Sequence, residues 1–277
     1  FTFDKLVKSG NSATIKNHKL TLEFTSNPAW YAIQSLPYLM EYPNDCSEQT
    51  FSRLYANSIA SHIVNLNPQI KRVFEQWRNQ TPDALLSNLG KNKELKSFLL
   101  QETPWVRDAK GESERKRRIS ILFDLNNMAN EELSAINQLK KLQTNNGGWS
   151  WFKGMRDDRY MTQYIITGLG KLNKLGVLIG NKEVNRMINN GIVYTDNRLR
   201  EDYEKLLSLE KEGGINLNDN HLNYSQIQYL YLRSFYLNHS LSIDNLEAYN
   251  YYKNQAKQYW NTQNTYMQGM IAIALHR

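Results

Sequence analysis

The chain has 277 residues, of which 40% are hydrophobic and 12% aromatic, which suits one large domain with a buried core and argues against disorder. Its formal net charge of +7 is spread too thinly for a nucleic-acid groove, and no segment approaches the roughly 20 apolar residues that span a bilayer. A single cysteine excludes an internal disulfide and a thiol-rich metal centre, so we predict no cofactor. From the charge and the length of the apolar segments we predict no nucleic-acid partner and no membrane insertion of this domain.

The N-terminal segment differs from the rest of the chain. Leu20, Leu22 and Phe24 alternate with polar residues, which is the period of a half-buried strand, so residues 1–25 are predicted to be a β tail belonging to a neighbouring domain. Residues 26–277 instead predict successive helices divided by Pro, Gly and Asn clusters. After a helix beginning near Cys46, the apolar stripes cover 70–77, 85–100, 119–128, 133–142, 161–178, 184–207, 227–237, 246–260 and 267–275.

About ten helices with short connections and no later strand signal predict an all-α fold. We expect an alpha/alpha toroid of helical hairpins, the architecture of terpenoid cyclases and prenyltransferases, with the short β segment at its N-terminus. The last stripe stops at Arg277 with no capping Gly or Pro, and the chain opens on Phe1 rather than a signal peptide. We therefore expect a domain that is truncated at its C-terminus and belongs to a larger protein.

The segment from Tyr42 to Gln49 carries the most chemical information. Pro43 ends the preceding helix, Asn44 or the following Asp is a suitable N-cap, and Cys46 then falls in the first turn of the next helix. Unpaired N–H groups and the helix dipole favour a thiolate there, which makes the sulfur a better nucleophile and a better leaving group. Gln49 lies one turn on and on the same face, so the thiolate can attack its amide carbon, expel ammonia and leave a thioester.

Glu48 lies between these two residues and has two readings. The favoured one is a favourable interaction with the helix N-terminus, and the alternative is an acid–base aid to ring closure. Taken alone, a Cys-x-Glu-Gln tetrapeptide more often means a buried thiol beside a capping Glu than a reactive site.

The surroundings of this tetrapeptide change that weighting. The stretch from Tyr42 to Gln49, preceded by Asn27-Pro28-Ala29-Trp30 and followed by Phe51-Ser52-Arg53, resembles the thioester region of bacterial alpha-2-macroglobulins, relatives of the complement thioester proteins. The resemblance assigns the thioester to Cys46 and Gln49. One position departs from the pattern, because Asp45 stands where the family often has Gly and places a charge beside the thioester.

A second stretch is similar to the same family. It runs from Asn146 to Phe152 and continues at Met161-Thr162-Gln163-Tyr164. A thioester survives only where water and stray amines are excluded, and an aromatic wall can provide that exclusion. The candidates are Trp149, Trp151, Phe152, Tyr160 and Met161, with the alternative that most of them are ordinary core residues at a helix–helix corner.

The resemblance implies a covalent endopeptidase inhibitor. A protease would cleave a bait segment elsewhere in the larger protein, which rearranges so that the thioester acylates a lysine of that protease. In complement relatives a His near the second stretch redirects the reaction towards hydroxyls, and none of the five His residues lies there, so we expect direct attack by an amine. Each thioester reacts once, so we expect an inhibitor and not an enzyme, with Cys46 largely a free thiol in the isolated domain.

The resemblance also implies a setting. Similar bacterial proteins reside in the periplasm or cell envelope, often lipid-anchored through the parent protein, and guard the envelope. The partners that follow are attacking proteases, other domains of the same large protein and, as an open question, a penicillin-binding protein.

Two other classes remain as alternatives. Gln143, Gly147 and Trp149 have the Gln-x-x-x-Gly-x-Trp spacing of terpenoid cyclases, and the Gly-Gly-Trp resembles elements of prenyltransferases, although an Asp-rich ionisation motif and a convincing zinc set are lacking. The adjacent Asp157 and Asp158 could suggest a glycosidase pair, but a solvated loop explains them better. The second class is a purely structural helical domain in which Cys46 is inert.

Overall fold

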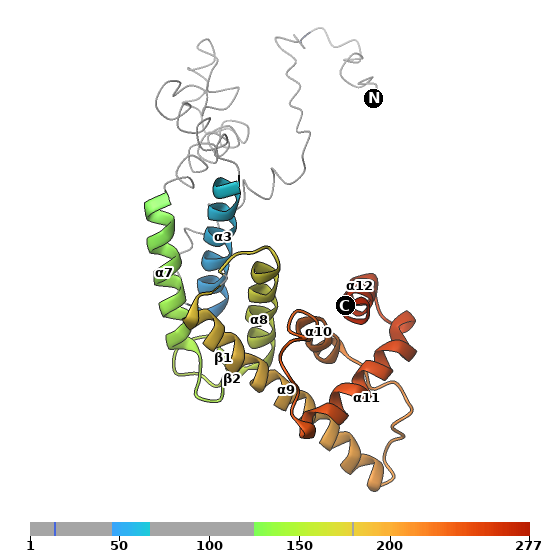
Figure 1. Cartoon of the computed structure of the whole chain (residues 1–277). Helices are drawn as coiled ribbons and strands as arrows, with labels where there is room; N and C mark the ends of the chain where they lie inside the picture. The colour runs from blue at the N-terminus through green and yellow to red at the C-terminus, as the bar shows by residue number, and fades with distance from the viewer. Residues whose placement is uncertain (1–13, 15–45, 67–124, 179) are drawn as a thin grey trace.

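The computed structural model describes residue 14 and residues 46–66, 125–178 and 180–277 (Figure 1). Except for Thr14, the predicted β tail at 1–25 lies outside these residues, and so do the stripes at 70–77 and 85–100, positions 119–124 of the next stripe and the N-capping candidates Asn44 and Asp45. Within them the chain forms α3 (Ser47–Leu66), α7 (Leu125–Leu142), β1 (Trp149–Ser150), β2 (Asp157–Asp158), α8 (Arg159–Lys174), α9 (Lys182–Lys211), α10 (Tyr224–Arg233), α11 (Ile243–Tyr259), η4 (Trp260–Thr262) and α12 (Thr265–His276). The all-α class is therefore confirmed for the described residues.

The described helices form two layers that alternate along the chain. Helices α3, α8, α10 and α12 pack against one another in that order, while α7, α9 and α11 follow one another on their outer side. Figure 1 shows the two layers curving from α7 and α3 towards α11 and α12. Hairpins of one inner and one outer helix are the unit from which alpha/alpha toroids are built.

Apolar periodicity placed these helices well, with two differences. The stripes at 119–128 and 133–142 were separate predictions, but residues 125–142 form one helix, because the polar residues between the stripes continue its solvent face. The expectation of no later strand is wrong, since β1 and β2 pair antiparallel with Trp149 opposite Asp158. Two residues per strand are too few to produce a period-2 signal.

Short polar side chains fix where several helices begin. Asp158, Asn181, Asn223 and Asn264 each accept a hydrogen bond from backbone N–H groups in the first turn of the following helix. These bonds satisfy amides that have no partner inside the helix, and each such cap contributes about 1 kcal/mol. Capping therefore sets the first residue of these helices at the level of local sequence.

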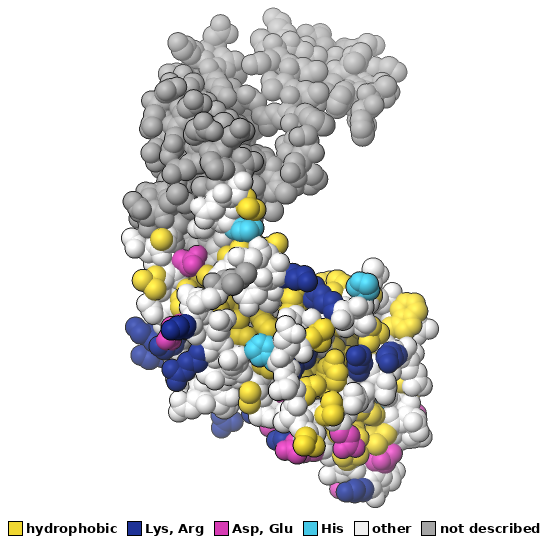
Figure 2. Space-filling view, viewed as in Figure 1, with side chains coloured by type: hydrophobic (Ala, Val, Ile, Leu, Met, Phe, Trp, Pro, Cys, Tyr) yellow, Lys and Arg dark blue, Asp and Glu magenta, His cyan; other side chains and the backbone are white. Residues whose placement is uncertain are grey.

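Two hydrophobic clusters fill the space between the layers. The first joins α3, α7, α8 and the start of α9 around the fully buried Trp149, and the second joins the remainder of α9 to α10, α11 and α12 around Tyr229 and Tyr252. Figure 2 shows hydrophobic side chains gathered over the α10 to α12 end, with Lys and Arg side chains beside them. None of the helices in the described part of the chain is both long enough and apolar enough to cross a bilayer.

Candidate functional site

Cys46 lies immediately before the first residue of α3 and is 5% exposed. Its carbonyl accepts from the Thr50 N–H at 2.9 Å, and its Sγ accepts from the Gln49 N–H at 3.4 Å. Cys46 is therefore the N-cap of α3, a position where Ser, Thr, Asp or Asn usually supplies an oxygen acceptor. The sequence predicts Cys46 in the first turn of this helix, and the structure instead places it at the N-cap, immediately before the first helical residue.

Ser47, the first residue of α3, ties the helix to the β1 strand. Its N–H donates to the Trp151 carbonyl at 2.9 Å, and its Oγ donates to the Ser150 carbonyl at 2.5 Å. Ser47 is fully buried, so both bonds form away from water. The structure thus brings together residues 46–53 and 146–164, the described parts of the two stretches that carry the resemblance.

Gln49 and Glu48 differ in how their side chains are satisfied. The Gln49 Oε1 is buried and has no hydrogen-bond partner among the described residues. Glu48 Oε1 accepts from the Ser52 hydroxyl at 3.3 Å, and that hydroxyl lies 3.4 Å from the Tyr164 hydroxyl. Glu48 therefore belongs to a polar chain that runs away from Cys46 towards α8.

The five residues predicted to shield the thioester divide into two groups. Trp149 and Met161 are fully buried, and the Trp149 indole donates to the Leu139 carbonyl at 2.9 Å, which is the role of a core residue. Trp151, Phe152 and Tyr160 are 39%, 49% and 48% exposed. Trp151 stacks on Tyr160, and the two rings make an exposed aromatic pair. The backbone carbonyl of the same Trp151 accepts the hydrogen bond from the Ser47 N–H.

The residues whose spacing suggested a terpenoid cyclase lie in and beside the loop that precedes β1. Gln143 Nε2 donates to the carbonyls of Gly147 and Met187, both at 2.9 Å. Gly147 has φ of +92°, and a Cβ there would stand 2.3 Å from the Asn190 carbonyl oxygen. In this structure the Gln-x-x-x-Gly-x-Trp segment therefore fastens the loop to α9.

Asp157 and Asp158 do not form a solvated loop, contrary to expectation. Both lie half-buried in β2. Asp157 accepts from the Tyr194 hydroxyl at 2.6 Å and from Asn146 Nδ2 at 2.9 Å, whereas Asp158 caps α8 by accepting from the Met161 N–H. Although burial raises the Asp157 pKa, the hydrogen bonds from Tyr194 and Asn146 outweigh it and leave that pKa below its usual value.

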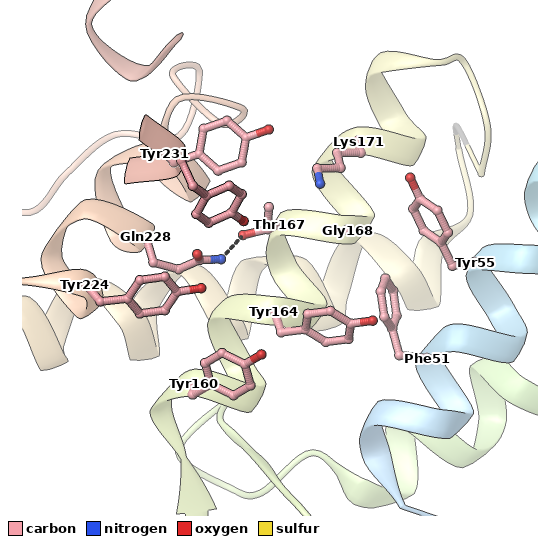
Figure 3. Close-up of a pocket in the computed structure, with 11 residues that line it drawn as sticks. Phe51, Tyr55, Tyr160, Tyr164, Thr167, Gly168, Lys171, Tyr224, Gln228 and Tyr231 are labelled. Atoms are coloured by element: carbon pink, nitrogen blue, oxygen red, sulfur yellow. Dashed lines mark hydrogen bonds between the residues drawn. The ribbon is translucent and has the colours of Figure 1, made fainter. Parts of the chain in front are cut away.

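A tyrosine-rich cavity of about 280 Å³ opens on the inner layer, close to this segment (Figure 3). All four inner helices line it, and its residues are Phe51, Tyr55, Tyr160, Tyr164, Thr167, Gly168, Lys171, Tyr224, Gln228, Tyr231 and Tyr266. Burial is the main cause that raises the pKa values of Tyr55, Tyr164 and Tyr224, so these phenols stay neutral at physiological pH. We refer to this cavity as the tyrosine pocket.

Sequence reasoning missed the tyrosine pocket, although a signal for it exists. Tyr160, Tyr164 and Lys171 recur at steps of four and seven, and Tyr224, Gln228 and Tyr231 at steps of four and three, so each set shares one helix face. Tyrosine counts as apolar in a periodicity scan, so these faces look like core. Elsewhere in the described residues, no group of three or more His, Cys, Asp or Glu side chains could hold a metal ion.

Comparison with known proteins adds no relative. No protein-family model, no curated protein and no solved structure matches the chain.

Proposed function

We propose that this chain is the helical thioester domain of an alpha-2-macroglobulin-like endopeptidase inhibitor, with Cys46 and Gln49 as the reactive pair. The observation that carries the proposal is the position of the Cys46 sulfur. It lies buried at the N-terminus of α3 and 3.4 Å from the backbone nitrogen of Gln49. A sulfur held there by an N–H donor lies one turn from the carboxamide that it would attack.

The reaction forms one bond and breaks another. The Cys46 thiolate adds to the Gln49 Cδ, the carbon–sulfur bond forms, and the carbon–nitrogen bond breaks so that ammonia leaves with the proton from the thiol. The buried Gln49 Oε1 becomes the thioester carbonyl oxygen. A carboxamide oxygen without a donor costs about 1–3 kcal/mol, and a thioester oxygen is a weaker acceptor that loses less, so this unpaired atom favours the acylated form.

The remaining parts of the proposal follow from the family. The two helical layers would close into an alpha/alpha toroid, and the 1–25 segment would belong to an adjacent domain. Cleavage of a bait segment by an attacking protease would unmask the thioester, and a lysine amine of that protease would add to the Gln49 carbonyl and release the Cys46 thiol. Each domain would react once, as an inhibitor, in the periplasm or cell envelope.

Cys46 has to be kept from water for such a bond to persist. Ser47, the residue after Cys46, is anchored to the backbone of Ser150 and Trp151, and the Trp151 ring stacks on Tyr160. We propose that these two exposed rings, and not the buried Trp149 and Met161, form the chain's own part of the shield. A neighbouring domain resting on them would complete it.

Intact-mass analysis of the native protein with and without methylamine tests the proposal. A thioester makes the protein lighter by one ammonia, and methylamine then adds at Gln49 while a thiol appears. Cys46→Ala, which cannot form the thioester, should show the plain sequence mass and no uptake. A wild-type protein with the plain mass, a free thiol and no uptake at any methylamine concentration would contradict the proposal and favour the structural alternative.

A further inference from the structure

We propose that the tyrosine pocket is a binding site for a small aromatic carboxylate, independent of the thioester. Neither Cys46 nor Gln49 lines the pocket, so the two sites share no reacting atom, although Tyr160 both lines the pocket and belongs to the proposed thioester shield. At about 280 Å³ the cavity lies just below the range of about 300–1,000 Å³ for ligand pockets, which suits a ligand no larger than an aromatic amino acid.

The walls select a flat apolar body. Figure 3 shows tyrosine rings from three helices turned towards a common space. Tyr160 and Tyr164 stack with an interplanar angle of 17°, and Phe51 meets Tyr164 edge-on, so the rings hold one another in fixed orientations. Fixed rings offer faces and edges to another aromatic ring with little loss of side-chain entropy.

One polar atom in the wall lacks a partner. Gln228 is 6% exposed, and its Nε2 donates to the Thr167 hydroxyl at 3.4 Å, while its Oε1 is buried without a donor among the described residues. Thr167 itself donates to the Gln163 carbonyl at 2.6 Å, so it cannot also donate to Gln228. A ligand hydroxyl or N–H that reaches the Gln228 oxygen would satisfy it.

The charge of the pocket selects an anion. Lys171 lies over the Tyr231 ring at 5.9 Å, and within the described residues no carboxylate pairs with this lysine and none lines the pocket. A ligand amine would gain cation–π attraction from the rings but would be repelled by the Lys171 ammonium. A carboxylate gains the Lys171 charge and can also accept from the neutral hydroxyl of Tyr55.

Calorimetric titration of the 277-residue chain with 3-phenyllactate tests this assignment, because that probe carries a ring, a hydroxyl and a carboxylate. We expect saturable binding, tighter by about tenfold than that of phenethyl alcohol, which lacks the carboxylate, or of phenethylamine, which lacks both the carboxylate and the hydroxyl and carries a cation. Lys171→Met should weaken binding about tenfold, whereas Lys174→Met, which removes the same charge from the same exposed end of α8, should leave it unchanged.

A second pair of measurements isolates the Gln228 oxygen. The probe 3-phenylpropionate lacks the hydroxyl, so it should bind wild type several-fold more weakly than 3-phenyllactate and bind Gln228→Met as well as wild type does. Binding in Cys46→Ala should equal that in wild type, which separates this site from the thioester. Equal or tighter binding of phenethylamine, an unchanged affinity in Lys171→Met, or no saturable binding of 3-phenyllactate would each overturn the proposal.

Discussion

The backbone N–H of Ser47 donates to the carbonyl of Trp151 at 2.9 Å, and this bond joins the start of α3 to the end of the β1 strand. The Ser47 hydroxyl adds a second bond to Ser150, 103 residues along the chain. The position of Cys46 is thus set by a long-range contact as well as by its own helix. Changes at this contact should alter both stability and the reactivity of the thiol.

Ser47→Ala should lower the free energy of unfolding by about 1–2 kcal/mol, because it leaves the buried Ser150 carbonyl without its donor. The same change should increase the rate at which Cys46 reacts with a thiol reagent, since the β1 segment is held less firmly against it. Urea unfolding and thiol titration measure the two effects. Ser208→Ala, at an exposed position of α9, is the control. It should change the free energy of unfolding by no more than about 0.5 kcal/mol and leave the rate of the thiol reaction unchanged.

Gly147 and Gly154 form a matched pair for the loop around β1. Both have positive φ, +92° and +85°, but a Cβ at Gly147 would meet the Asn190 carbonyl whereas Gly154 faces open space. Gly154→Ala should cost only the left-handed backbone strain, about 1–2 kcal/mol. Gly147→Ala should cost about 1–3 kcal/mol more because of the added clash. Equal losses in urea unfolding would mean that the loop moves away from α9 without penalty.

Arg233 and Asp196 form a buried ion pair between α10 and α9, 3.2 Å apart and 2% and 5% exposed. Removing the cation in Arg233→Met should cost about 3–5 kcal/mol at pH 7, because Asp196 then carries an unpaired buried charge. Burial already raises the Asp196 pKa, and Arg233 opposes that rise. The Arg233→Met, Asp196→Asn double variant should recover part of the loss, and a loss equal to that of the single variant would contradict the electrostatic explanation.

The sign of the pH dependence follows from the raised pKa of Asp196. A carboxyl whose folded pKa is raised stabilises the protein most below its unfolded pKa of about 3.9, and that contribution is lost as the pH rises through the folded pKa. Without Arg233 the folded pKa rises further. The stability difference between wild type and Arg233→Met should therefore shrink as the pH is lowered from 7 towards 4, and urea unfolding at several pH values measures it.

Asp157 shows the opposite sign. Its folded pKa is lowered, so its contribution is present above the unfolded pKa of about 3.9 and is lost as the pH falls through the folded value. Tyr194→Phe removes the hydroxyl that donates at 2.6 Å and should raise the Asp157 pKa. A carboxyl-carbon NMR titration measures the shift, and Tyr203→Phe, whose hydroxyl donates to Glu247, should leave it unchanged.

Whether the sequence predicted a feature correctly depends on how far apart in the chain the interacting residues lie. Local periodicity located the stripes of α8 to α12, because a helical face repeats within a few residues whatever it packs against. The N-cap role of Cys46 depends instead on Ser47 being held by Trp151, a contact between distant segments that no local pattern encodes. The tyrosine pocket is lined by four helices. The sequence could therefore assign its residues to helix faces but could not show that those faces meet at one cavity. The roles of Cys46 and Gln49 stay a prediction.

Substitutions at Cys46 separate its helix-capping role from its proposed chemistry. Cys46→Ser keeps a side-chain acceptor for the Gln49 N–H, so it should retain wild-type stability within about 0.5 kcal/mol, while Cys46→Ala loses the cap and about 1 kcal/mol. Both should abolish methylamine uptake, because neither has the thiolate that displaces ammonia. Gln49→Glu should also abolish uptake, since it keeps the thiol but removes the carboxamide. Uptake that persists in Cys46→Ser would mean that another residue holds the acyl group, whereas loss of uptake in all three variants with an intact fold in Cys46→Ser would tie the reaction to this pair.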